Sequence, residues 1–125
     1  MRLISTPNAP APGGAYSQAV SVDGMLYTAG QVGADPTTGE RPADYRAEVR
    51  QALANLGAVI EAGGSSVDRI VRTMCLITDV ADFTVFNEEY AAFFGDHRPA
   101  RSTFSVGLAG GYRFEIEAIA KVEGQ

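Results

Sequence analysis

The sequence has few of the residues that build disulfides and metal sites. It contains one cysteine, Cys75, and one histidine, His97, among 125 residues, and no tryptophan. A single cysteine excludes an internal disulfide and is typical of a chain in a reducing compartment. With one histidine, a zinc site made only from this chain's side chains is not expected. We therefore predict a cytoplasmic protein with no metal ion and no other cofactor.

Long apolar segments are also missing. No run approaches the roughly 20 residues that a membrane-spanning helix requires, and residues 1–10 offer no continuous apolar segment for a signal peptide. The hydrophobic content of 46% and the charged fraction of 20% are typical of a folded globular domain. We expect a single domain over residues 1–125 that has no membrane partner.

Positive charge is scarce and scattered. The net charge is −5, and Lys121 is the only lysine among ten cationic side chains. Proteins that bind nucleic acids present a basic face that contacts many phosphates. Because the chain offers no such cluster of cations, we expect no nucleic-acid partner.

Hydrophobic periodicity divides the chain into strands and two helices, in the order β-β-α-β-α-β-β. The predicted strands cover residues 15–22, 25–29, 70–78, 101–106 and 114–120, the predicted helices cover 44–62 and 83–94, and residues 1–14 are expected to form an extended, partly mobile arm. This order indicates an α+β fold with a mixed sheet. Two helices can cover only one face of such a sheet, so the other face, with Cys75 or Met74 and with Ile119, needs another cover. A second copy of the chain is the simplest one, which predicts a homo-oligomer.

Arg101 is the first candidate site residue. Pro99 favours extended backbone just before it, so Arg101 is predicted at the start of a strand. A glycine-rich turn then leads to a second strand in which Glu115 and Glu117 share a face. An arginine at the start of a strand and near a carboxylate suits a pocket for a small carboxylic acid. The alternative is an ordinary hairpin with an exposed arginine and a solvated glutamate face.

Other reactive residues have structural explanations. His97 lies between charged residues and is interpreted as a loop histidine rather than a catalytic base. Cys75 lies in an apolar strand and is predicted to be a small buried side chain rather than a nucleophile. The aromatic residues of the second helix have the spacing of core residues. Asn87 is unexpected in that helix, where it is either functional or on the solvated side. Gly30 marks either a β-bulge or a close backbone approach to a ligand.

Several motifs together resemble the Rid/YjgF family, whose members are also called reactive intermediate/imine deaminases and endoribonuclease L-PSP-like proteins. The resemblance covers nearly the whole chain, and the Pro-Ala-Arg-Ser and Glu-Ile-Glu-Ala blocks are highly specific at this spacing. The matching segments are residues 14–19, 30–31, 35–39, 55–56, 62–63, 82–83, 99–102 and 115–120, together with Asn87, Tyr90, Phe93 and Phe94.

The resemblance implies a chorismate-mutase-like α+β fold and a homotrimer with a central barrel, with pockets between subunits. Archetypal members hydrolyse 2-imino acids, released by pyridoxal-phosphate enzymes, to 2-oxo acids and ammonia. The implied catalytic residues are Arg101, which grips the substrate carboxylate, Glu115, near the reacting water, and Tyr16, which lines the pocket. The implied substrate-binding residues are Arg101, Tyr16, Gly30 through its backbone, Asn87 as a polar wall and Thr103.

The chain departs from the family pattern at a few positions. Thr103 stands where the family often has cysteine, and Glu48 stands where many members have glutamine. Alanine replaces a proline at position 15, a common serine at position 29 and a proline at position 109. None of these changes removes a principal polar group, so they bear on pocket shape and substrate preference.

Two functions fit the residues. One is hydrolytic deamination of 2-iminobutanoate or 2-iminopropanoate. The other is a non-catalytic or regulatory module that binds a small carboxylate through the same arginine. Ribonuclease activity is not expected of a chain with net charge −5.

Overall fold

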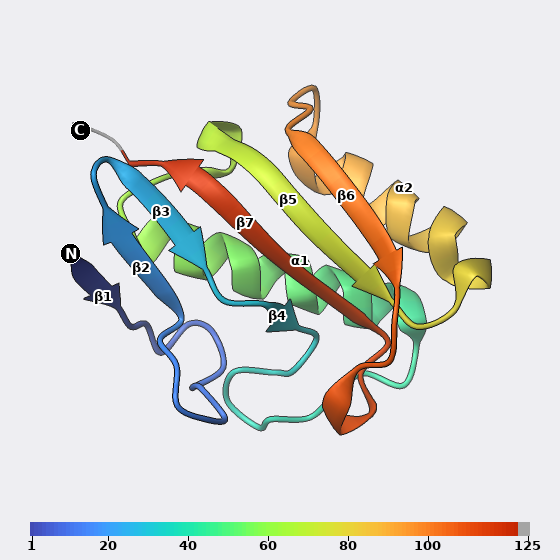
Figure 1. The fold of residues 1–125 in the computed structure, drawn as a ribbon. Coiled ribbons are helices and arrows are strands. Elements are labelled where there is room, and N and C mark those ends of the chain that lie inside the picture. Colours follow the sequence, from blue (N-terminus) through green and yellow to red (C-terminus); the bar gives the residue numbers. More distant parts are fainter. Residues whose placement is uncertain (123–125) are drawn as a thin grey trace.

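The computed structural model describes residues 1–122 and contains one β-sheet and two α-helices (Figure 1). This confirms the α+β class predicted from the sequence. The strands are β1 (Arg2–Ile4), β2 (Ala19–Val22), β3 (Met25–Thr28), β4 (Gln31–Val32), β5 (Ile70–Ile77), β6 (Ala100–Ser105) and β7 (Phe114–Lys121). The helices are α1 (Tyr45–Ala62) and α2 (Phe83–Phe94), and short 3-10 turns lie at Val67–Arg69, Val80–Asp82 and Ala109–Gly111.

Both helices begin and end where their capping residues predict. The Asp44 carboxylate accepts a hydrogen bond from the Ala47 amide at 3.0 Å, which satisfies a free N–H in the first turn of α1. After α1 the chain reverses through Gly64, whose φ is +83°, and after α2 through Gly95, whose φ is +63°. Glycine adopts these left-handed conformations without steric cost, so both helices end sharply.

Strand β7 lies in the middle of the sheet, whose order is β1-β2-β3-β7-β5-β6 with β4 also paired to β7. The pairing of β5 with β6 is parallel, and the other pairings are antiparallel. Because β5 lies between β6 and β7, these two strands do not form the hairpin that the sequence suggested. The 3-10 turn and the loop around it instead carry the chain across the end of β5 (Figure 1).

The N-terminal segment is part of the sheet, so the prediction of a partly mobile arm is wrong for much of it. Strand β1 pairs antiparallel with β2. Beyond it, the buried side chain of Gln18 accepts a hydrogen bond from the Thr6 amide at 2.7 Å. The same side chain donates to the carbonyls of Thr6 and Pro10 at 3.1 and 2.9 Å. One amide side chain therefore supplies the backbone partners that fix this proline-rich stretch.

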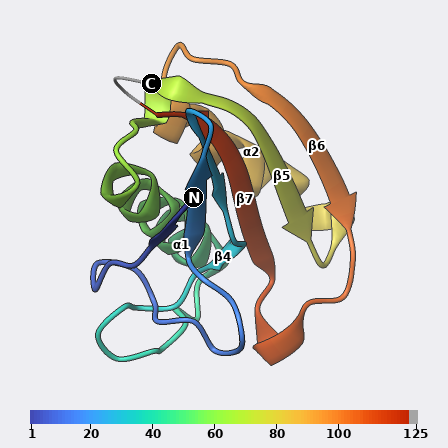
Figure 2. The ribbon, with the colours of Figure 1, turned by 60° about the vertical axis from the view of Figure 1, so that its left-hand side comes forward.

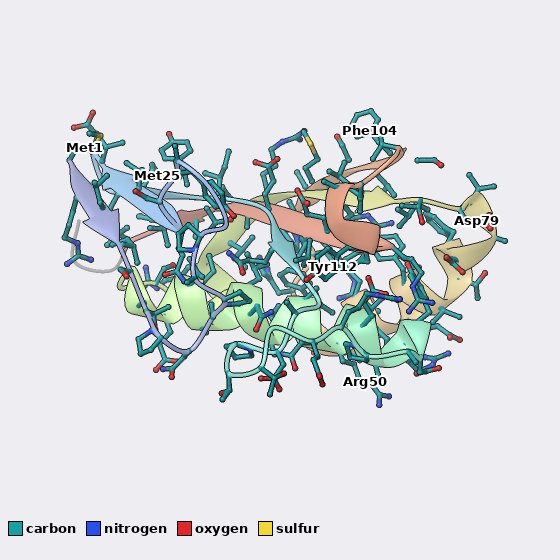
Figure 3. All side chains as sticks on the ribbon, turned by 90° about the horizontal axis from the view of Figure 1, so that it is seen from below. Met1, Met25, Arg50, Asp79, Phe104 and Tyr112 are labelled. Carbon is teal, nitrogen blue, oxygen red and sulfur yellow. The ribbon has the colours of Figure 1, made fainter. Side chains whose placement is uncertain are left out.

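The two faces of the sheet have different surroundings. Figure 2 shows α1 and α2 on the same side, and the alternate side chains of β5 and β7 that point to them, such as Cys75, Ile77 and Ile116, are buried. On the other face, Tyr27 and Phe104 are 45% and 50% exposed, and Figure 3 shows Phe104 on the side away from α1. Met74 rather than Cys75 is on this uncovered face.

Within residues 1–122, neither helix has the length and apolarity needed to cross a membrane.

Candidate active site

Arg101 lies on the helix-covered face of the sheet, as the second residue of edge strand β6. Its guanidinium carbon is 4.7 Å from the ring centroid of Tyr90, 5.1 Å from that of Phe86 and 5.8 Å from that of Phe83. All three rings come from α2, where positions three and four apart share a face. The aromatic side chains of α2 therefore form a surface for the cation.

Within residues 1–122, the guanidinium of Arg101 has one polar partner. Its Nη1 donates to the Oδ1 of Asn87 at 2.8 Å. Among residues 1–122, no carboxylate forms an ion pair with Arg101, whereas Arg41, Arg46, Arg50 and Arg113 all have one. A cavity of about 370 Å³ lies beside it, lined by Asn87, Tyr90, Ala91, Arg98, Pro99 and Arg101. Arg101 therefore combines full charge, unused donors and adjacent space.

Glu115 lies on the opposite, uncovered face of the sheet, on strand β7. Leu76 and Val32 are its register partners on β5 and β4, and Glu117 follows on the same face. Partial burial raises the pKa of the Glu115 carboxyl above its usual value, and the negative charge of Glu117 raises it further. A carboxyl whose pKa lies nearer to neutrality is better suited to accept and return a proton.

Gly30 makes room for the Glu115 carboxylate. A Cβ atom at position 30 would lie 2.1 Å from Glu115 Oε2, so a residue other than glycine would force the Glu115 side chain to move. From Tyr27 to Gln31 the chain advances four residues while its partner β7 advances three, from Ile119 to Ile116. This extra residue is the β-bulge that the sequence offered as one reading of Gly30. The bulge and the close approach thus occur together, and the close approach is to Glu115.

Arg101 and Glu115 are not brought together within one chain. Strand β5 separates their strands, and the two side chains leave the sheet on opposite faces. Thr103 lies on the Arg101 face, beside Cys75, and Asn87 contacts Arg101 directly. Gly30 lies against Glu115. The predicted site residues therefore form two groups on two faces.

Tyr16 belongs to neither group by direct contact. It lies in the loop before β2 with 54% of its surface exposed, and its hydroxyl accepts a hydrogen bond from the Gly13 amide at 3.2 Å. Among residues 1–122, its side chain has no hydrogen bond to Arg101 or Glu115. An exposed tyrosine in an ordered loop is free to contact a ligand or a second chain.

The two residues that were assigned structural roles have them. Cys75 is fully buried, and burial raises the pKa of its thiol to about 12, so the reactive thiolate is not formed near neutral pH. His97 uses its Nε2 to hydrogen-bond with the Ile70 carbonyl at 2.7 Å, which joins the loop after α2 to the start of β5. Both observations agree with the sequence interpretation.

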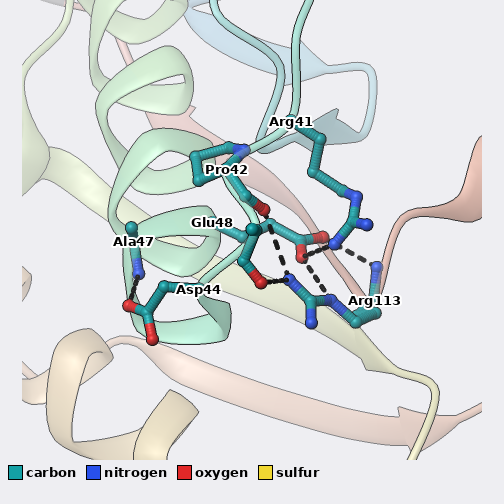
Figure 4. Close-up of polar contacts among 7 residues, drawn as sticks. Arg41, Pro42, Asp44, Ala47, Glu48 and Arg113 are labelled. Carbon is teal, nitrogen blue, oxygen red and sulfur yellow. Dashed lines mark hydrogen bonds and ion pairs between the residues drawn. The ribbon is translucent and has the colours of Figure 1, made fainter.

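Glu48 is fully buried in the first turn of α1 and forms a second polar cluster (Figure 4). Its carboxylate accepts hydrogen bonds at 2.7 Å from both the amide and the Nε of Arg113, and one at 3.1 Å from Arg41 Nη1. Arg113 also donates to the Ala43 carbonyl at 3.0 Å. Because Arg113 is two residues before Glu115, this cluster fixes the start of the strand that carries Glu115.

The aromatic surface under Arg101 was not predicted from the sequence. The spacing of the aromatic residues of α2 predicted core positions, and this holds for the buried Phe86 and Tyr90 but not for Phe83, which is 42% exposed. Helical periodicity reports which residues share a face but not what crosses that face. The signal that was available is the aromatic spacing at 83, 86 and 90 around Asn87, a polar residue on the edge of an apolar stripe.

Comparisons with known proteins find similar sequences and a similar fold. The chain is 46% identical over 121 residues to 2-iminobutanoate/2-iminopropanoate deaminase of Rattus norvegicus, across 95% of this chain and 88% of the rat protein. It is 45% identical over 123 residues to the Escherichia coli K12 protein of the same name, across 95% and 96% of the two chains. The crystal structure of E. coli TdcF with bound serine superposes with a TM-score of 0.94 at 40% identity, covering 97% of this chain and 98% of that one.

The family itself follows from a match along almost the whole chain. The family model described as Endoribonuclease L-PSP matches residues 6–122, which include both groups of candidate site residues. The Rid/YjgF resemblance seen in the sequence is thereby confirmed. The chain belongs to the endoribonuclease L-PSP family.

Proposed function

We propose that this protein hydrolyses small 2-imino acids, of the 2-iminobutanoate and 2-iminopropanoate type, to 2-oxo acids and ammonia. The observation that carries the proposal is the environment of Arg101: among the residues that the structure describes its guanidinium has a single, neutral partner in Asn87, and a cavity lies beside it. A guanidinium with unused donors binds a carboxylate through two parallel hydrogen bonds. The rat and E. coli relatives named as deaminases of these imino acids support the same substrate class.

The reaction needs few protein groups because a protonated imine is already a good electrophile. Water adds to the imine carbon while the Glu115 carboxylate takes one of its protons. The carbinolamine that results collapses when that proton returns to nitrogen. Ammonia leaves as the C=O bond forms, and the Glu115 carboxylate takes the hydroxyl proton and releases it to solvent. Catalysis then requires only that the protein orient the substrate and water and transfer protons between them. Arg101 orients the substrate, and because the substrate's carboxylate charge hardly changes, its contribution lowers KM more than it raises kcat.

Opposite faces of one sheet cannot contact the same small molecule, so we infer that each site joins two chains. Arg101, Asn87 and Thr103 from one chain meet Glu115, Gly30 and Tyr16 of another. The exposed apolar side chains of the uncovered face, Tyr27 and Phe104 among them, provide the surface on which copies associate. A chorismate-mutase-like homotrimer with a central barrel satisfies both requirements. Light scattering should report three chains per particle.

A coupled assay tests the activity. The protein is added to a threonine dehydratase reaction that contains semicarbazide, which traps the imine before it hydrolyses. We expect faster release of 2-oxobutanoate and less trapped adduct. The Arg101→Lys variant is the matched control, since it keeps the charge but loses the planar fork, and it should recover only a small part of the effect. Unchanged release and trapping, with 2-oxobutanoate still bound, would instead identify a carboxylate-binding module.

Mixed oligomers test whether the site is shared. The Arg101→Ala and Glu115→Gln variants are unfolded together in equal amounts and refolded, so that chains combine at random. If each site takes Arg101 from one chain and Glu115 from its neighbour, about a quarter of the sites contain both native residues and activity returns to that level. If both residues served within one chain, the mixture would be as inactive as its parents.

A further inference from the structure

The side chain of Tyr90 lies directly under the guanidinium of Arg101 and is itself fixed. Its hydroxyl is hydrogen-bonded to Thr73 Oγ1 at 2.7 Å. Tyr90 is 6% exposed and Thr73 is fully buried. Thr73 is also the register partner of Arg101 in the parallel pairing of β5 with β6. The hydroxyl of Tyr90 therefore ties its ring to the residue beside Arg101 on the neighbouring strand.

Two other rings of α2 pack against the ring of Tyr90. The ring centroid of Phe94 is 4.6 Å away along α2, and that of Phe86 is 5.9 Å away. The guanidinium carbon of Arg101 is nearer to Tyr90, at 4.7 Å, than to either of the other two rings it contacts. Asn87 holds the guanidinium at Nη1. Tyr90 and Asn87 together thus constrain both the plane and one edge of the cation.

An aromatic ring attracts a cation without neutralising it. The face of the ring carries partial negative charge, so a guanidinium stacks on it favourably. A carboxylate in the same place would cancel the charge of Arg101 and compete with an anionic ligand. Burial raises the pKa of the Tyr90 phenol, so this ring stays neutral near physiological pH.

We propose that Tyr90 is a positioning residue for substrate binding: its ring holds the Arg101 guanidinium in place without a counterion, and Thr73 holds the ring. This inference rests on the proposed function, because it assumes that Arg101 binds the substrate carboxylate. Tyr90 acts through Arg101. Its effect is on KM and on carboxylate affinity, and kcat is affected little.

Two variants separate the ring from the hydroxyl. In the dehydratase-coupled assay, Tyr90→Leu should raise KM about tenfold with kcat within about twofold, and Kd for 2-oxobutanoate measured by calorimetry should rise in parallel. Tyr90→Phe keeps the ring and loses the bond to Thr73, so KM should rise no more than about threefold. Phe93→Leu is the matched control, because that ring of the same helix packs against Phe94 and the core but contacts neither Tyr90 nor Arg101. It should lower Tm and leave KM unchanged.

A fluorinated ring tests the same inference without removing any volume. Phenylalanine and 3,5-difluorophenylalanine have nearly the same shape, but fluorine withdraws negative charge from the ring face. At position 90, the fluorinated residue should raise KM above the value for Tyr90→Phe at equal Tm. The same pair at position 93 should give equal KM values. This series remains informative if Tyr90→Leu does not fold.

The side-chain NMR signal of Arg101 gives a readout apart from activity. A ring stacked on the guanidinium shifts the Nε–Hε proton upfield. That shift should persist in Tyr90→Phe and be reduced in Tyr90→Leu, where the rings of Phe83 and Phe86 remain. The inference is overturned if Tyr90→Leu leaves KM and the Arg101 signal as in the wild type, or if Phe93→Leu raises KM equally. Either result with normal wild-type turnover leaves the proposed function standing. A wild-type protein that neither binds 2-oxobutanoate nor accelerates hydrolysis refutes the proposed function instead.

Discussion

Arg101 and Arg113 occupy opposite kinds of environment although each has an aromatic ring beside it. Arg113 lies 5.6 Å from the ring of Tyr45 and donates to the buried carboxylate of Glu48 and to a backbone carbonyl. Arg101 lies 4.7 Å from the ring of Tyr90 and donates to one neutral amide. One cation is paired with a carboxylate of its own chain, and the other retains its charge and donors for something outside it.

This contrast separates structural from ligand-binding arginines by a physical criterion. A buried carboxylate without its partners would be costly, so the Glu48 cluster holds its segments together whether or not a ligand is present. Leaving Arg101 without a counterion costs little, because the faces of the aromatic rings attract the cation and the adjacent cavity leaves it partly solvated. Variants at the two places should therefore divide cleanly into losses of stability and losses of activity.

The largest effect on stability is expected at Glu48. Glu48→Ala removes the acceptor of Arg113 and Arg41 and should lower the free energy of unfolding by about 3 kcal/mol. Glu48→Gln keeps one acceptor and should cost about half as much. Urea denaturation at one fixed protein concentration measures both. Equal stability of Glu48→Ala and wild type would show that the cluster is not needed for folding.

Arg101→Ala should have the opposite profile. We expect kcat/KM to fall at least about 100-fold, since a charge-assisted bidentate pair is lost. The free energy of unfolding should change by less than about 1 kcal/mol, because within residues 1–122 Arg101 gives the fold only its partly solvated contacts with three aromatic rings and one neutral hydrogen bond. The measurements are the coupled assay and urea denaturation. A kcat/KM comparable to that of the wild type would remove Arg101 from the mechanism, and Arg101 and Arg113 would then not differ in function.

The sequence predicted most of what depends on short-range chemistry. Asp44 as a helix cap, the turn at Asp23-Gly24, where both residues have positive φ, and the glycine stops all follow from local conformational preference. The uncovered face was predicted because two helices can cover only one of the two faces of a sheet. Strand pairing did not follow, because periodicity gives the face of a residue but not its neighbour. The expected closeness of Arg101 to a carboxylate failed for that reason.

The candidate site was predicted in its residues but not in its arrangement. Family motifs pointed to Arg101, Asn87 and Glu115, yet the parallel insertion of β5 between β6 and β7 puts the first two on the opposite face from the third. The anchoring of the N-terminal segment by Gln18 was missed for a similar reason. A single buried amide that satisfies several distant backbone groups leaves no periodic trace in the sequence.

Glu115→Gln should separate chemistry from binding. It removes the proton acceptor, so kcat should fall about 100-fold, while Kd for 2-oxobutanoate stays within about threefold because Arg101 is unchanged. The pKa of Glu115 is raised in the folded chain, so this group favours folding below its unfolded pKa and loses that contribution as pH rises through the folded pKa. The variant should therefore have a higher Tm than wild type at pH 7. A large loss of affinity would contradict the division of roles between the two residues.

Glu117→Gln gives the smallest effect and tests the electrostatics of the uncovered face alone. The charge of Glu117 raises the pKa of the Glu115 carboxyl, second to burial. Removing that charge favours the carboxylate form of Glu115, so the acid limb of the kcat–pH profile should move to lower pH with the plateau unchanged. Glu61→Gln removes an equal charge from an exposed position on α1 and serves as the control. If both variants move the limb equally, the shift reflects net charge and not the pairing on β7. If only Glu117→Gln moves the acid limb of the kcat–pH profile, the titrating group is Glu115, which lies on the face of the sheet opposite Arg101.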